Sequence, residues 1–262
     1  SSALSPCRDR LFSSAEECAS LWKQLGCDYN VVQVSSGPLC GRLRVDHHDG
    51  ILLVSMQADQ ALLIEGTRHP RWLPFTIEHT DNFGNHRHFG ESVAPNTLAG
   101  FNTQLKETLM RTSPGGNRIG AVLVDRHRVD AWAEVMRTAD ICDRMEQNNT
   151  AILRSTDHRN LRQLMPLPAW KGVDVQHSFQ PDLLEAQLIE CLSPESSTLL
   201  QPVLQTHHSD LVRELVRFSF QASTEPISLS LVCQALFTTK TTLTVSCREM
   251  FGYGPMALMR RI

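Results

Sequence analysis

Residues 226–262 of the 262-residue chain read PISLSLVCQALFTTKTTLTVSCREMFGYGPMALMRRI, and they are its most informative part. Apolar residues recur at helical spacing on either side of Phe237-Thr238, which we predict to be a tight turn. Thr239 suits a helix N-cap, so the second helix should run over 240–251 and end at Gly252, with a further helix after Pro255. Two short helices joined by a tight turn form the helix-turn-helix plan.

The second of these helices has a polar face that suits duplex DNA. Short polar and basic side chains near the start of such a helix can reach base edges and thymine methyl groups in the major groove. The side chains that we expect to contact bases are Lys240, Thr241, Thr242, Thr244, Val245 and Arg248. For anchoring phosphates we expect Arg213, Arg260 and Arg261, with Arg248 as a further candidate.

The charge of the chain restricts where DNA could bind. The net charge of −3 provides no chain-wide attraction for nucleic acid, so a DNA-binding surface has to be local. From Ser209 to the end of the sequence, six Lys and Arg residues stand against four Asp and Glu residues. This local charge of +2 gives mild support to a DNA contact in the last part of the chain.

Residues 226–262 resemble, without a gap, the first helix-turn-helix and the start of the linker helix of AraC/XylS-type transcription regulators. The matching positions comprise the apolar core, the cap, the Arg-Glu pair and the Gly-x-x-Pro ending: Pro226, Ile227, Leu229, Ala235, Thr239, Leu243, Arg248, Glu249, Gly252, Pro255 and Arg260. Three positions depart from the family pattern. Phe237 replaces the usual turn glycine, Cys247 an aromatic residue, and Gly254 a serine, which indicates a divergent subgroup.

The resemblance implies a cytoplasmic transcription activator whose partners are double-stranded DNA, a small effector molecule and a second copy of the chain. It also implies a second helix-turn-helix after the linker helix. The sequence ends at Ile262, inside that linker, so we expect only the first half of the DNA-binding unit here. The resemblance leaves two alternatives open for that half alone, weak DNA binding or none.

The rest of the chain predicts an α+β protein. Over residues 1–150, short β-rich runs separated by turn signals such as Asp49-Gly50 predict an antiparallel domain, either a sandwich or a cupin-like barrel, that would bind the effector. Residues 151–207 should form a helical linker or dimerisation segment, and 208–262 the first half of the DNA-binding domain. In the middle segment a candidate dimer stripe consists of Leu183, Leu184, Leu188 and Cys191, although burial in their own domain explains these residues equally well.

Two groups of side chains in the first 150 residues are candidates for binding. Arginines could line an anion pocket for the effector, and the candidates are Arg42, Arg44, Arg68 and Arg71. His86, His88 and Glu91 resemble the first metal motif of cupin barrels, but the glutamate comes too early, and solvated loop histidines are the simpler interpretation. We therefore expect no metal, no cofactor and no enzymatic activity. A metal-dependent cupin-type enzyme is the main rival, and a ligand-binding or dimerisation protein with a non-functional DNA module is the third possibility.

The remaining composition indicates the compartment. The eight cysteines are scattered and form no Cys-x-x-Cys pair, which argues against structural zinc and a disulfide scaffold. The first ten residues contain no apolar leader, and no apolar run is long enough to span a membrane. A reduced cytoplasm is the simplest location.

Overall fold

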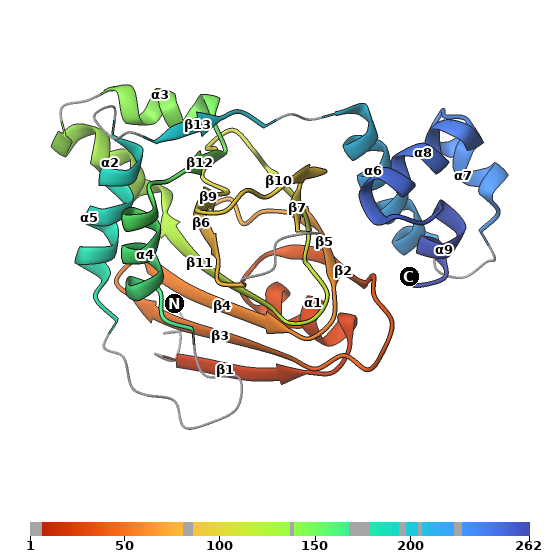
Figure 1. Cartoon of the computed structure of the whole chain (residues 1–262), viewed down its shortest axis with the longest axis horizontal. Coiled ribbons are helices and arrows are strands. Elements are labelled where there is room, and N and C mark those ends of the chain that lie inside the picture. Colours follow the sequence, from red (N-terminus) through yellow and green to blue (C-terminus); the bar gives the residue numbers. More distant parts are fainter. Residues whose placement is uncertain are drawn as a thin grey trace.

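The computed structural model describes residues 7–80, 86–136, 139–167, 179–193, 198–203, 206–222 and 227–262. Two antiparallel sheets lie between two groups of helices (Figure 1). The larger sheet contains, in spatial order, β1 (Cys7–Phe12), β3 (Gly41–His48), β4 (Ile51–Ala58), β11 (Asn117–Asp125), β6 (Trp72–Glu78), β9 (Thr97–Ala99), β12 (Thr150–Ile152) and β13 (Leu199–Gln201). The smaller sheet contains β2 (Asp28–Gln33), β5 (Leu62–Thr67), β10 (Glu107–Arg111), β7 (Arg87–His88) and β8 (Glu91–Ser92).

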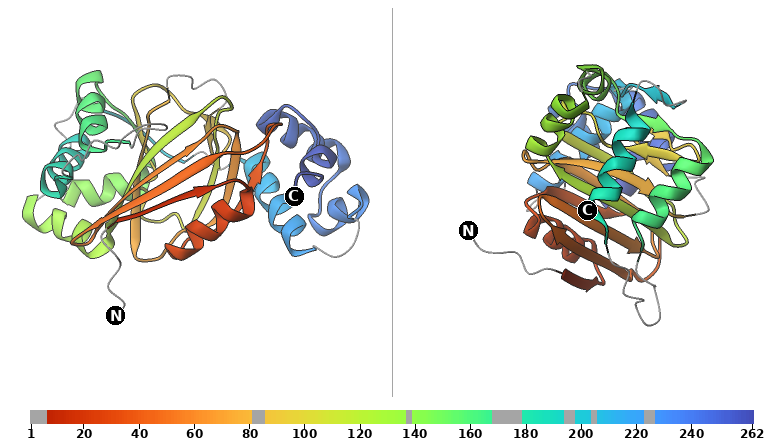
Figure 2. Two further views of the ribbon diagram at one scale, coloured as in Figure 1. Left: turned by 90° about the horizontal axis from the view of Figure 1, so that it is seen from below. Right: turned by 90° about the vertical axis from the view of Figure 1, so that its left-hand side faces the viewer.

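Helices cover the outer face of each sheet, at opposite ends of the molecule (Figure 2). The larger sheet packs against α2 (Arg126–Met136), α3 (Ala139–Gln147), α4 (Ser155–Leu164) and α5 (Pro181–Leu192). The smaller sheet packs against α6 (His207–Gln221), α7 (Leu229–Ala235), α8 (Lys240–Phe251) and α9 (Pro255–Met259). The remaining helix, α1 (Ala15–Gln24), contributes Cys18 and Trp22 to the core between the sheets.

β4 is buried along its whole length because each of its faces meets a different core. Ile51 and Leu53 belong to the core under α2–α5, whereas Leu52 belongs to the core between the sheets. In β5, Ile64 belongs to the core between the sheets and Leu63 to the core with the C-terminal helices. Strands that are covered on both faces are apolar at consecutive positions, which explains the unbroken apolar runs in the sequence.

The structure confirms a mixed α+β chain with an antiparallel β-rich N-terminal part. Of the two predicted alternatives, the closed barrel is wrong, because the strands form two separate sheets. The predicted segment 151–207 is not purely helical, since β12 spans its start and β13 joins the same sheet. The predicted dimer stripe on α5 is mostly internal. Three of its members, Leu184, Leu188 and Cys191, are buried in the core of the larger sheet, while Leu183 is exposed.

Local signals account for the ends of the C-terminal helices. Thr206 caps α6. Ser228 caps α7, and Thr239 caps α8 by accepting a hydrogen bond from the backbone of Thr242 at 3.1 Å. Gly252 ends α8 in the left-handed conformation, as predicted. The expected match at Pro226 lies outside the described residues.

In the part of the chain that the structure describes, no helix combines the length and the apolar composition that crossing a lipid bilayer requires.

Candidate functional site

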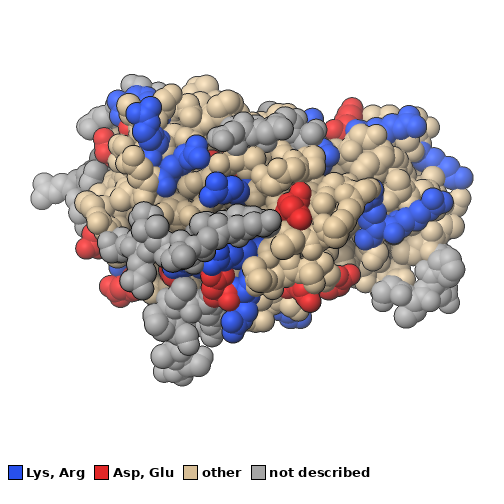
Figure 3. All heavy atoms as spheres, turned by 60° about the horizontal axis from the view of Figure 1, so that its bottom comes forward, with Lys and Arg blue, Asp and Glu red and all other residues tan. Residues whose placement is uncertain are grey.

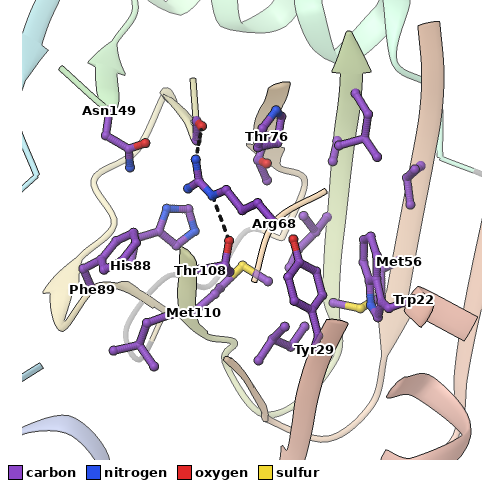
Figure 4. A pocket seen from close by; sticks show the side chains of 18 residues that line it. Trp22, Tyr29, Met56, Arg68, Thr76, His88, Phe89, Thr108, Met110 and Asn149 are labelled. Atoms are coloured by element: carbon purple, nitrogen blue, oxygen red, sulfur yellow. Dashed lines mark hydrogen bonds between the residues drawn. The ribbon is translucent and has the colours of Figure 1, made fainter. Parts of the chain in front are cut away.

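A cavity of about 80 Å³ lies between the two sheets. Most of its wall is apolar and comes from α1, β4, β5, β10 and β11, through Trp22, Val54, Met56, Ile64, Met110 and Leu123. Arg68, just after β5, reaches into this cavity (Figure 4). Its Nε donates to Thr108 Oγ1 at 3.0 Å and its Nη1 to the carbonyl oxygen of Gly100 at 2.8 Å. The cavity therefore combines an apolar wall with one cationic group.

Arg68 is only 7% exposed, and among the described residues no carboxylate pairs with its guanidinium. Burial lowers the pKa of Arg68 to about 10, so the side chain remains charged near neutral pH. Neighbouring polar groups do not supply a negative charge: burial lowers the pKa of His88 to about 3, which leaves a neutral imidazole. The Nε2 atom of His88 has no hydrogen-bond partner in the described residues.

The other three predicted effector arginines lie elsewhere and are already paired. Arg42 forms an ion pair with Asp9 of β1, and Arg44 pairs with Asp46 on its own strand. Arg71 pairs with Asp125 at 2.6 Å, and its side chain is 60% exposed. None of the three lines the cavity. Of the four predicted arginines, the structure brings only Arg68 to it.

The three predicted metal candidates do not form one cluster in the described residues, although the rings of His86 and His88 lie in a T-shaped arrangement with their centroids 5.3 Å apart. His86 is buried with its Nδ1 atom 2.7 Å from Glu78 Oε2, whereas His88 lines the cavity and Glu91 is exposed on β8. Within the described ranges, no three His, Cys, Asp or Glu side chains are close enough to hold one metal ion.

The predicted base-contacting side chains lie on the outer part of α8. Lys240, Thr241, Val245 and Arg248 are exposed, and Thr242 and Thr244 are half-buried. The opposite face of α8 is buried through Leu243, Ser246, Cys247, Met250 and Phe251. Cys247, which stands where the family has an aromatic residue, is therefore a core residue, and burial raises the pKa of its thiol to about 12.

Two basic groups on α8 are free to meet an anionic partner. Among the described residues, neither Lys240 nor Arg248 has a carboxylate within ion-pair distance. The end of the molecule formed by the C-terminal helices presents several basic side chains and few acidic ones on the side that Figure 3 shows. This local excess of positive charge is what a chain of net charge −3 needs in order to bind a polyanion.

The phosphate-anchoring candidates have different surroundings. Arg260 is exposed, with no side-chain partner among the described residues. Arg261 donates to the carbonyl oxygen of Ser35 at 3.0 Å and stacks over the ring of Tyr253. Arg213 is the exception, because its Nη1 lies 2.5 Å from Glu107 Oε2 at the contact with the smaller sheet. Arg213 is therefore occupied, whereas Arg260 and Arg248 are accessible.

A network of charges joins α6 to the outer face of the smaller sheet. Arg217 donates through Nε to Glu65 Oε1 on β5 and through Nη2 to Glu107 Oε1 on β10, both at 2.6 Å. Glu65 has no exposed side-chain surface, and it also accepts from Asn30 Nδ2 at 3.0 Å. Burial raises the pKa of Glu65, so the carboxylate depends on these partners for its charge.

A second connection runs from the cavity to α8. Phe89 lines the cavity and also belongs to the core that contains α6 and α8. It occupies a turn with Gly90, where a Cβ atom would come 3.3 Å from the side chain of Met250. Arg111, on β10, donates to the carbonyl oxygen of Met250 at 3.0 Å. Phe89, together with Arg111 next to the cavity residue Met110, thus connects the cavity wall to α8.

Sequence reasoning missed Glu65, Glu107 and Arg217. One signal was available for Glu65, which is a lone acid directly after the apolar run 61–64. A buried acid requires a cationic partner, but nothing local indicates that the partner stands more than 150 positions later.

Comparison with known proteins adds little. No protein-family model matches the chain, and no curated protein matches its sequence. The chain is similar to a solved structure of ToxT from Vibrio cholerae at 7% identity, with 98% of this chain and 80% of that chain covered and a TM-score of 0.28. A superposition this loose does not establish a common fold, and it does not carry the functional assignment.

Proposed function

We propose that the chain is a DNA-binding transcription regulator of AraC/XylS type, in which α7 and α8 act as a helix-turn-helix. The observation that carries this proposal is the division of α8 into two faces. Leu243 and Cys247 are buried against the rest of the C-terminal helices, while Lys240 and Arg248 are exposed without acidic partners in the described residues. A helix held in this way can present its N-terminal turns to the major groove.

In this proposal bases are contacted by the exposed and half-buried side chains of α8, and phosphates by Arg248, Arg260 and Arg261. Arg213 is left out of the contact set, because displacing it from Glu107 would leave that carboxylate with Arg217 alone. Arg261 can bind phosphate only by giving up its hydrogen bond to Ser35.

The cavity is the proposed effector site, and the smaller sheet couples it to the DNA-binding helices. Thr108 of β10 contacts Arg68 in the cavity, and the preceding residue, Glu107, points to the other face and binds Arg213 and Arg217 of α6. A ligand that shifts β10 would change both contacts. Effector binding and DNA binding would then be linked through one strand.

The proposal is tested by selection from a random duplex library with the full chain, followed by sequencing. We expect the enrichment of one short motif, and enrichment that is lost in a Thr241→Ala, Arg248→Ala variant. A chain that binds ligand but enriches no motif would instead fit the ligand-binding protein with a non-functional DNA module. Dimerisation, a cytoplasmic location and the absence of metal-dependent enzymatic activity are part of this proposal.

A further inference from the structure

The charge of Arg68 is unusual for its surroundings. A buried guanidinium normally lies beside a carboxylate, because the desolvation of an unpaired ion costs several kcal/mol. Here the partners are a hydroxyl and a carbonyl oxygen, Thr108 Oγ1 and Gly100 O, which are dipoles rather than charges. Of the four arginines predicted for the effector site, the other three, Arg42, Arg44 and Arg71, each pair with an aspartate. Arg68 alone among those four is held charged in an apolar cavity.

The cavity has room for a small anion beside Arg68. Its volume of about 80 Å³ exceeds the 10–15 Å³ that one water molecule needs. The guanidinium points into this space beside the imidazole of His88, whose Nε2 lacks a partner among the described residues (Figure 4). Side chains of Met56, Ile64 and Leu123 line the same space.

We propose that the cavity binds a small, mostly apolar molecule with one anionic group, and that Arg68 binds the anionic group while the methionine and aliphatic side chains enclose the rest. That the bound molecule acts as an effector rests on the proposed function, whereas the binding itself does not. One cation among apolar walls suits a monoanion such as a carboxylate, because a phosphate dianion would remain half neutralised. The small volume selects short-chain or single-ring acids over long-chain ones.

The experiment measures the melting temperature of the full chain with butanoate, hexanoate, octanoate or phenylacetate, each against its matched primary alcohol. A ligand that binds the folded state raises the melting temperature in proportion to the logarithm of its concentration above Kd, so each series yields an affinity. We expect at least one acid to bind about tenfold or more tightly than its alcohol, the ratio that a charge-assisted hydrogen bond supports. No stabilisation by any of the acids, or equal affinity for acid and alcohol, would overturn the proposal.

Variants identify the residue responsible. Arg68→Met keeps the length of the side chain and removes the charge, and we expect its ratio of acid to alcohol affinity to fall to about one. Because the substitution also removes an uncompensated buried ion, its melting temperature without ligand should not fall far below that of the parent chain. Arg71→Met, the matched control outside the cavity, should keep the parent ratio.

A structural role for Arg68 would give a different pattern. In that case Arg68→Met would lower the melting temperature strongly. Arg68→Lys, which keeps the charge, distinguishes the binding role from the structural one. The proposal requires Arg68→Lys to retain a preference for the acid over the alcohol; an Arg68→Lys variant that folds without that preference contradicts it. Since no DNA is present, failure here leaves DNA recognition by α8 standing, and failure of DNA binding leaves this site standing.

Discussion

The half-buried Arg217 and the fully buried Glu65 form an ion pair between the C-terminal helices and the sheet that lines the cavity, with 2.6 Å between Nε and Oε1. Glu65 has no exposed side-chain surface, and its other oxygen accepts from Asn30. The two residues are 152 positions apart in sequence, so the pair exists only in the folded chain. It makes α6 part of the same folded unit as β5.

Removal of Arg217 should therefore destabilise the protein strongly. Arg217→Met leaves Glu65 buried with only a neutral amide partner, and we expect a loss of about 3 kcal/mol in the free energy of unfolding. Urea denaturation monitored by circular dichroism measures it. Arg260→Met removes the same charge from an exposed position and should stay within about 0.5 kcal/mol of the parent. Equal effects of the two substitutions would show that the pair does not bind α6 to the sheet.

The turn between α7 and α8 contains a strained residue. Phe237 has φ +49° and is 97% exposed, at the position where the AraC/XylS pattern has glycine. A left-handed conformation costs an L-residue about 1–2 kcal/mol of strain, which glycine does not have. Glycine also makes the unfolded chain more flexible, so the net gain in stability is smaller than the strain removed. Phe237→Gly should therefore raise the free energy of unfolding by about 0.5–1 kcal/mol. Phe237→Ala keeps Cβ and the strain, so thermal unfolding should show no such gain; a gain in both variants would trace the effect to the exposed ring.

Acid should destabilise the chain through His79. Burial, with Arg162, Arg118 and His158 nearby, lowers the pKa of His79 to about 3, while an unfolded histidine titrates near its usual 6.5. Between these two values the unfolded state binds a proton that the folded state does not. The stabilisation is therefore complete above pH 6.5 and falls by about 1.4 kcal/mol per pH unit below it.

The test is the free energy of unfolding between pH 6.5 and 5. His79→Gln, which cannot take up the proton, should show a shallower loss of stability over this window than the parent. If His79→Gln has the same slope as the parent, the buried neutral histidine is not the cause of acid sensitivity.

Sequence reasoning was most successful where the determining interactions are local. The bounds of α8 follow from the Thr239 cap and from Gly252, both within one turn of the helix ends. It failed where partners are distant. Arg42, Arg68 and Arg71 look alike in sequence, and only the fold shows that Asp9 and Asp125 neutralise two of them and leave the third in the cavity. The sequence could not distinguish a barrel from a sandwich for a related reason, since alternation within single strands does not show which strands pair.

The central claim is that the outer face of α8 reads duplex DNA, and a fluorescence anisotropy titration tests it most directly. The selected duplex and a scrambled one are titrated with the parent chain, Arg248→Ala and Arg159→Ala, an exposed control on α4, between 50 and 200 mM salt, a range in which phosphate contacts respond strongly. We predict that the parent binds the selected duplex about tenfold or more tightly than the scrambled one. Arg248→Ala should lose this affinity, and its log affinity should fall less steeply with log salt concentration, by about one in slope. Arg159→Ala should match the parent. Equal affinity for both duplexes, or an unchanged titration for Arg248→Ala, would contradict the account.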